Sequence, residues 1–178
     1  MKRINLLFCV VLSVLTFVAC GKAEPGDNFK PGEDKPSEII VRGVIDDGTV
    51  NPENGDAEVD YSKCPVLLTG SNIQWFNPRS KEVRFSQIKP YGFYNTYRKL
   101  IFEMNGEQLF TAATLTDVSS AVYNDLVLYY DLNGRYYLKD AYPDFALNHE
   151  QTRSNMEKRK DVWNKFLNQL RKENRLRQ

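Results

Sequence analysis

The chain has 178 residues, of which 42% are hydrophobic and 26% charged, with a formal net charge of +1. This length fits one folded domain with a real core. Nucleic acid is not an expected partner, because the basic C-terminal stretch is accompanied by an acidic arm in a chain that is expected to be exported. The charge is unevenly distributed: residues 21–60 carry 4 basic and 11 acidic side chains, whereas residues 149–178 carry 9 basic and 4 acidic ones. An acidic arm and a basic tail could therefore meet each other, a partner or a surface.

Residues 1–20 have the layout of a secretory signal peptide, with Lys2 and Arg3 before an apolar run that stops at Cys20. The run is too short for a comfortable transmembrane helix, which needs about 20 apolar residues, and no second run of that length follows. An ordinary signal peptide with a chance cysteine, or an uncleaved helix, are the alternatives.

The sequence Val18-Ala19-Cys20 resembles the lipobox of bacterial lipoproteins, although Phe17 stands where leucine is usual. The resemblance implies that a lipid is attached to the Cys20 sulfur, that the chain is cut after Ala19, and that the new amino terminus is acylated. Two or three acyl chains hold a protein to a bilayer almost permanently. In lipoproteins generally, Gly21 rather than aspartate at the next position implies the outer membrane.

The segment 21–37 is rich in proline, glycine and charge, and Phe29 is its only large apolar side chain. Such a segment cannot bury enough apolar surface to offset its ordering entropy, which predicts a disordered tether. The predicted organisation is a signal peptide over 1–19, the lipidated cysteine and tether over 20–37, and a single α+β domain over 38–178. The chain resembles small envelope lipoproteins of Bacteroidota in its order of a lipobox, an acidic Pro/Gly tether and a small tyrosine-rich domain. This resemblance implies no particular activity.

The first strands of the domain are predicted from β-rich stretches between turn signals. Residues 38–45 form one such stretch, and residues 66–75 and 83–88 flank an Asn77-Pro78 turn. The apolar and polar residues alternate around that turn, which predicts a half-buried hairpin.

An Asn105-Gly106 turn joins the stretch 97–104 to the stretch 107–115 in the clearest predicted hairpin. A two-residue loop there pairs Phe102 with Leu109. Apolar residues on both faces indicate a hairpin at the centre of the sheet.

A further hairpin is predicted through Asn133-Gly134, between residues 126–131 and 136–139. A two-residue loop at that turn pairs Tyr130 with Tyr137.

One long C-terminal helix is predicted, starting at Asn148 or at a Ser154-x-x-Glu157 capping box, with fraying last residues. Its apolar side chains recur at helical spacing and should dock on the sheet: Met156, Trp163, Phe166, Leu167 and Leu170. The predicted fold class is therefore α+β, an antiparallel sheet of sequential hairpins with a long amphipathic C-terminal helix packed on one face.

No residue pattern in the sequence predicts a catalytic site, a metal site or a cofactor site. Cys64 has no partner left after Cys9 and Cys20 are accounted for, and is interpreted as a small buried residue, with intermolecular pairing or a reactive thiol as the alternatives. His149 is the only histidine, and nothing in the spacing brings it to Cys64. The carboxylates of residues 46–60 lack EF-hand spacing, and Asp140 with Asp144 is a carboxylate pair without a known cleft. We therefore expect no enzyme and no cofactor.

The aromatic side chains are the feature most open to a binding role, because tyrosine offers a rigid apolar ring with a polar tip that suits sugar rings and protein interfaces. They gather in residues 91–97 and 129–142, and the alternative is that they are ordinary half-buried strand residues. The candidate ligand-binding residues are Tyr91, Phe93, Tyr94 and Tyr97.

The sequence thus favours a membrane-anchored, non-catalytic binding or assembly module of the outer membrane. Its predicted partners are the membrane, through the lipid on Cys20, and an unknown protein or glycan, with nucleic acid excluded. The alternatives are a glycan-binding lipoprotein that uses the aromatic loops, and an enzyme of an unrecognised kind.

Overall fold

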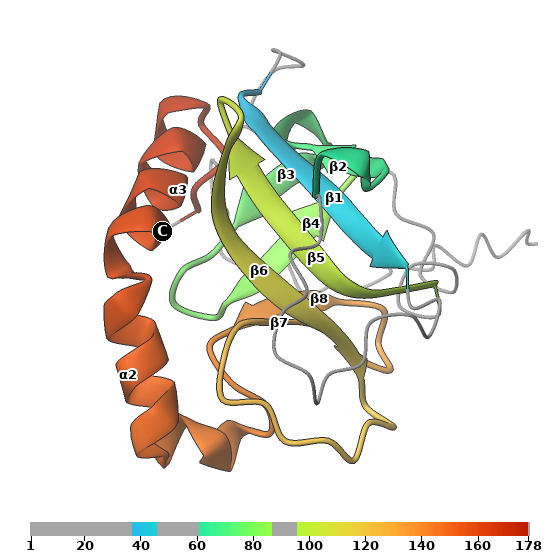
Figure 1. Ribbon diagram of the computed structural model, residues 1–178, viewed down its shortest axis with the longest axis vertical. Helices are drawn as coiled ribbons and strands as arrows, with labels where there is room; N and C mark the ends of the chain where they lie inside the picture. The colour runs from blue at the N-terminus through green and yellow to red at the C-terminus, as the bar shows by residue number, and fades with distance from the viewer. Residues whose placement is uncertain (1–36, 46–60, 87–95, 178) are drawn as a thin grey trace, which may run out of the picture.

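The computed structural model describes residues 37–45, 61–86 and 96–177. They form one mostly β unit, an eight-stranded sheet that curls into a nearly closed barrel, with helices along one side (Figure 1). The strands are β1 (Ile39–Ile45), β2 (Val66–Thr69), β3 (Ile73–Phe76), β4 (Glu82–Phe85), β5 (Tyr97–Met104), β6 (Glu107–Thr116), β7 (Val127–Tyr130) and β8 (Tyr136–Lys139). The α-helices are α2 (Glu150–Lys158) and α3 (Lys160–Lys172), and 3₁₀ turns are η1 (Tyr61–Lys63), η2 (Gly70–Asn72) and η3 (Asp144–Asn148).

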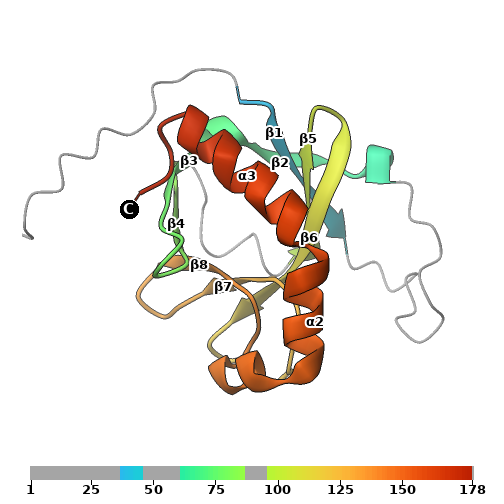
Figure 2. The same ribbon diagram turned by 90° about the vertical axis from the view of Figure 1, so that its left-hand side faces the viewer.

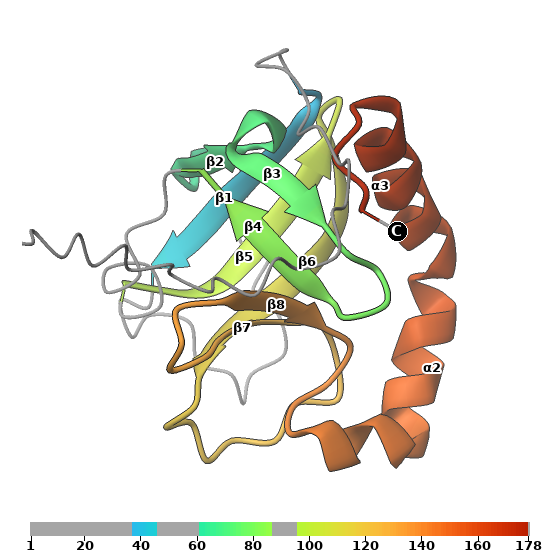
Figure 3. The ribbon, with the colours of Figure 1, turned by 180° about the vertical axis from the view of Figure 1, so that it is seen from behind.

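The strand order is β2-β1-β5-β6-β7-β8-β4-β3, so the two edge strands are neighbours in the sequence. Only the three residues of η2 separate β2 from β3. Because three residues cannot cross a flat eight-stranded sheet, whose strands lie about 4.8 Å apart, the sheet must curl until its two edges approach each other. Figure 3 shows β3 and β4 on the side that faces away from the viewer in Figure 1.

The predicted α+β class is wrong, because the described residues are mostly β and their sheet is a nearly closed barrel. Two details of the prediction are also wrong. First, the sheet is not made only of sequential hairpins. Strands β6 and β7 are adjacent and parallel, and β4 pairs with the distant β8 as well as with its sequence neighbour β3. Second, the predicted long helix is two shorter ones, with Arg159 between them at φ −92° and ψ 0°. The parallel pair was missed because the connection 117–126 carries no helical pattern, which is the usual signature of such a crossover.

The three predicted hairpins are present, and β5 and β6 lie at the centre of the sheet as expected. In the two Asn-Gly hairpins, the predicted pairs Phe102–Leu109 and Tyr130–Tyr137 are each wrong by one residue, although Met104 lies opposite Glu107 as a two-residue loop requires. A bulge at Phe102 and Glu103 sets Phe102 opposite Phe110 instead of Leu109. Across the other Asn-Gly turn, Tyr130 faces Tyr136 because the loop has three residues and ends on Gly134, at φ +81°.

The core lies inside the curled sheet and is closed on one side by α3. Phe166 and Leu170 are fully buried there, and the Phe166 ring lies 5.9 Å from Phe102 and 5.3 Å from Phe110, centroid to centroid. Figure 2 shows α3 crossing in front of the gap between β3 and β6. The apolar stripe of α3 is therefore core, as predicted, whereas Met156 of α2 is 39% exposed.

The last residues do not fray as predicted, because a Schellman motif turns the chain back after α3. Asn174 has φ +55°, its N–H donates to the Arg171 carbonyl at 3.1 Å, and the Arg175 N–H donates to the Leu170 carbonyl at 2.7 Å. The arm 175–177 then runs beside β3, where Phe76 exchanges backbone hydrogen bonds of 2.8 Å with Arg175 and Arg177. This arm covers the outer edge of β3.

Candidate functional site

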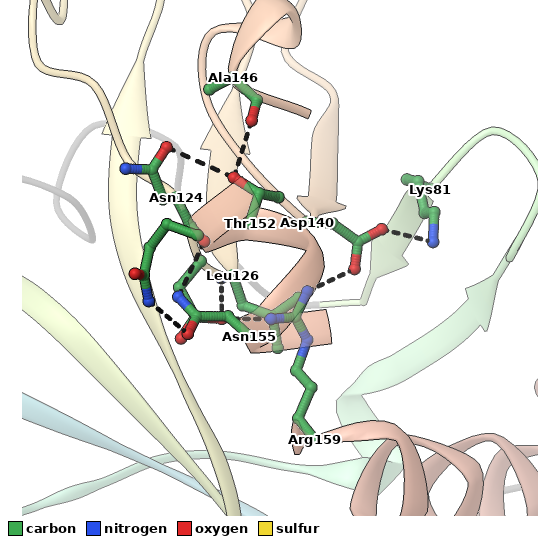
Figure 4. Close-up of polar contacts among 10 residues, drawn as sticks. Lys81, Asn124, Leu126, Asp140, Ala146, Thr152, Asn155 and Arg159 are labelled. Atoms are coloured by element: carbon green, nitrogen blue, oxygen red, sulfur yellow. Dashed lines mark hydrogen bonds and ion pairs between the residues drawn. The ribbon is translucent and has the colours of Figure 1, made fainter. Parts of the chain in front are cut away.

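Helix α2 docks on η3 and on the connection before β7 through polar side chains. Thr152, Asn155 and Arg159 are spaced by three and four residues, which places them on one helix face. Thr152 is fully buried and its hydroxyl donates to the Ala146 carbonyl at 2.7 Å, while the Asn155 amide donates to the Asn124 carbonyl at 3.0 Å (Figure 4). Each buried polar group thus has a partner, which burial requires.

The centre of this polar contact is a buried carboxylate, Asp140, held by two cations. Arg159 Nη2 donates to it at 2.7 Å and Lys81 Nζ at 2.9 Å, and Arg159 Nη1 also binds Asp125 (Figure 4). Burial by itself raises the pKa of Asp140, but the hydrogen bonds and charges of Lys81 and Arg159 outweigh it and lower that pKa below its ordinary value of 3.8. The Asp140 carboxylate is therefore ionised at neutral pH.

Lys81 reaches Asp140 from the end of the β3–β4 turn. The Asn77 side chain organises that turn by accepting hydrogen bonds from the N–H groups of Arg79 at 2.9 Å and Ser80 at 3.0 Å. Lys81 itself has φ +63°, a left-handed conformation that costs a non-glycine residue of the order of 1 kcal/mol. Its carbonyl accepts from the Leu138 N–H at 2.8 Å, so the strained residue ties the turn to β8.

Two open hollows share Lys81 and Asp140, and we call them together the groove. The first, the tyrosine hollow, has a volume of about 460 Å³. Its other lining residues include Tyr129, Asp131, Tyr137, Lys139, Asp144 and Leu147.

The half-buried rings of the tyrosine hollow are arranged around a lysine. The Tyr129 ring lies 6.0 Å from Tyr137 and 5.3 Å from Tyr142, centroid to centroid. The Lys139 ammonium is 4.6 Å from the Tyr129 centroid and 5.7 Å from that of Tyr137, and it binds Asp144 at 3.0 Å. The surface therefore combines apolar ring area with a charged pair at its rim.

The second hollow, the tryptophan hollow, has a volume of about 370 Å³. Beyond the shared pair it is lined by Arg153, Met156, Glu157, Arg159, Lys160 and Trp163. Lys81 Nζ lies 5.5 Å from the centroid of the Trp163 ring, and Lys160 binds Glu157 at 3.1 Å. Both hollows fall in the lower part of the size range of small-molecule sites, about 300–1,000 Å³.

Most of the predicted site residues lie outside the part of the chain that the structure describes. Those are Cys20, Tyr91, Phe93 and Tyr94. Tyr97 is the first residue of β5, three strands away from β8, and a Cβ on Gly43 of β1 would overlap its ring. The described structure thus places Tyr97 against β1 and does not join it to the groove.

The structure also locates the other side chains that the sequence analysis considered for a catalytic role. Asp140 and Asp144 line the same hollow, but each binds a lysine, and the lowered pKa of Asp140 suits it to hold a charge rather than to donate a proton. Cys64 is a half-buried free thiol, and His149 Nδ1 lies 3.0 Å from the Asn124 amide oxygen at the start of α2. Within the described residues, no group of three or more His, Cys, Asp or Glu side chains could hold a metal ion.

Sequence reasoning missed Lys81, Asp125 and Arg159, which organise the groove. They come from a turn, a connection and a break between helices, and no local pattern links them. The one available signal was the stretch 150–158, whose apolar content is limited to Met156 and therefore favours a helix that docks through polar groups.

Among the described residues no helix has the length and apolar character that crossing a bilayer requires. Comparison of the chain with protein-family models, with curated proteins and with solved structures finds no match in any of the three.

Proposed function

We propose that the protein is a lipid-anchored, non-catalytic binding module of the outer membrane, and that the groove is its ligand site. The anchor part of the proposal rests on the lipobox-like sequence at Cys20. The binding part rests on one observation, the concave surface on both sides of the Lys81–Asp140 ion pair, which combines aromatic rings with fixed polar groups.

The groove has the rigidity that a preformed site needs. Its polar centre joins the β3–β4 turn, the end of β8 and the junction of α2 with α3 through Lys81, Asp140 and Arg159. A strained turn held in place at such a point is typical of functional sites, because the surrounding structure must over-determine it. A ligand can therefore bind with little ordering of the protein.

The experiment is a binding assay with the full-length lipoprotein in detergent micelles and size-fractionated envelope extracts. Wild type is compared with Tyr129→Ala, which removes a ring of the groove, and with Trp75→Ala, which removes a half-buried ring that lies 5.1 Å from Arg177 and outside the groove. Circular dichroism checks that both variants are folded.

We expect at least one fraction to bind wild type and Trp75→Ala but not Tyr129→Ala. If every fraction that binds wild type also binds Tyr129→Ala equally, the groove is not the ligand site and the proposal is wrong.

A further inference from the structure

We propose that the ligand of the groove is an uncharged glycan chain, which lies across the Lys81–Asp140 pair with one sugar on the tyrosine hollow and another beside Trp163. The inference rests on the proposed function, because it names the ligand class of the same groove. It is carried by the rings, by the charge pairing and by the backbone of β8.

Each hollow offers an aromatic side chain that is only partly covered by the core. Tyr129 and Tyr137 lie side by side on β7 and β8, and Trp163 reaches the other hollow from α3. An aromatic face gives apolar contact to the C–H face of a sugar ring, while the ring hydroxyls remain free for polar partners at the rim. Burial raises the pKa of Tyr137, and its hydroxyl donates to Asp131 Oδ2 at 3.5 Å, which leaves its oxygen lone pairs to accept from a sugar hydroxyl.

The carboxylates that line the groove already have cation partners. Asp131 binds Arg135 at 3.0 Å, and the three others are paired as described above with lysine or arginine: Asp140, Asp144 and Glu157. A cationic ligand would have to displace a lysine or arginine from one of these carboxylates, and an apolar ligand would strip water from the pairs without replacing its hydrogen bonds. A neutral, hydroxyl-rich ligand can bond to the remaining lone pairs and N–H groups and leave each pair intact.

Arg153 adds a donor to the tryptophan hollow. Its guanidinium donates to the Asn148 carbonyl at 2.9 Å, which uses one of its five N–H groups. The others are available to sugar hydroxyls, and the side chain is exposed.

The backbone beside the groove argues against an extended peptide as the ligand. Strand β8 pairs with β7 on one side and with β4 on the other, and the Leu138 N–H donates to the Lys81 carbonyl at 2.8 Å. A peptide that adds a strand needs unpaired N–H and C=O groups along an edge, and β8 offers none at Tyr136 to Leu138.

The test is a glycan array followed by calorimetric titration of the full-length lipoprotein in micelles. The probes are neutral oligosaccharides from the monosaccharide to the hexasaccharide, their uronic-acid counterparts, and a library of unrelated peptides. The variants are Tyr129→Ala, Tyr129→Phe and Arg153→Ala, with Arg171→Ala as the control because Arg171 is an exposed arginine of α3 outside the groove.

We expect a neutral oligosaccharide to bind, and affinity to rise from the monosaccharide until the chain spans both hollows. Tyr129→Ala should weaken binding by about tenfold or more, the loss expected when an anchoring aromatic side chain is truncated, whereas Tyr129→Phe keeps the ring and should change it by less than about threefold. Arg153→Ala should weaken long chains more than short ones, and Arg171→Ala should change neither.

Groove-dependent binding of peptides, or of uronic-acid glycans alone, would overturn the glycan assignment and leave the groove standing as the ligand site. Binding of neutral glycans that Tyr129→Ala leaves unchanged would overturn the assignment of this groove to them. An array without any neutral glycan bound would overturn the inference by itself, whatever the envelope extracts show.

Discussion

Arg159 is the residue on which the contact between the helices and the sheet depends. Its side chain is 10% exposed and binds two carboxylates that lie 15 residues apart in the sequence, Asp125 and Asp140. Its own backbone is the break between α2 and α3. A single arginine thus ends one helix, starts the next and neutralises the buried charge between them.

We predict that Arg159→Met lowers the free energy of unfolding by about 2–3 kcal/mol. Removing one partner of a buried ion pair costs about 3–5 kcal/mol when the other charge is left alone, and Lys81 here still binds Asp140, which reduces the loss. The matched control is Lys160→Met, whose side chain is 61% exposed and whose pair with Glu157 should contribute less than about 0.5 kcal/mol. Denaturant unfolding measures both, and equal losses would contradict the assignment.

Asp140 should also make the stability depend on pH. Because its pKa in the folded protein lies below the ordinary value of 3.8, the unfolded chain takes up the proton at a higher pH than the folded one. The stabilisation is therefore complete above pH 3.8 and is lost as the pH falls through the lowered pKa. Melting curves of wild type and Asp140→Asn should differ most near neutral pH and converge in acid, whereas a gap independent of pH would show that Asp140 is not ionised in the fold.

At the scale of elements, the two helices are held to the sheet by different physics. Helix α3 buries Phe166 and Leu170 against the aromatic core, and its periodicity was readable in the sequence. Helix α2 presents Thr152 to the Ala146 carbonyl of η3 and Asn155 to the Asn124 carbonyl before β7, so its docking face is polar. The prediction of one apolar stripe over both helices is wrong for α2, because a face that docks through hydrogen bonds has no periodic pattern of apolar residues in the sequence.

The C-terminal arm is the second element that determines stability. We predict that deleting residues 175–178 lowers the free energy of unfolding by about 2–4 kcal/mol, since it removes two backbone hydrogen bonds to Phe76 and the bond from Arg175 to the Ile73 carbonyl, each contributing about 0.5–1.5 kcal/mol. It should also promote self-association, because the edge of β3 is uncovered. Unfolding curves and light scattering measure the two effects.

The control for that deletion is Arg177→Ala, which keeps the backbone pairing and removes the side chain that lies 5.1 Å from the Trp75 ring centroid. It should cost less than about 1 kcal/mol and leave self-association at the wild-type level, as expected of a partly exposed cation–π contact. A deletion variant with wild-type stability and wild-type self-association would mean that the arm does not protect the edge.

At the scale of the whole molecule, the ends of the described chain meet. The Ser37 hydroxyl donates to the Glu173 carboxylate at 2.7 Å beside the end of α3, and Lys172 lies 3.8 Å from Glu38. Figure 1 shows this end of the molecule opposite the start of α2 and the connection between β6 and β7. The segment that leads from Cys20 therefore joins the domain at the end away from α2.

Lipidation of Cys20 is a prediction for the whole molecule, because it decides where the domain works. Cells grown with labelled palmitate should incorporate it into wild type, and Cys20→Ala should abolish the incorporation and release the protein from membranes, since the acyl chains supply about 0.8 kcal/mol per buried CH₂. Cys64→Ala is the matched control and should remain labelled. Palmitate labelling of the Cys20→Ala variant would contradict the lipoprotein interpretation.

The sequence by itself determined the local pieces: β1, the turns at Asn77-Pro78, Asn105-Gly106 and Asn133-Gly134, and the apolar face of α3. Each of these depends on neighbouring residues, through turn chemistry or hydrophobic period. Only the tertiary structure decided the closure of the sheet, the parallel pairing of β6 with β7, and the groove. Asp125, Asp140 and Arg159 meet because three distant segments pack together, and the strength of such an ion pair depends on burial and distance, which no stretch of sequence carries.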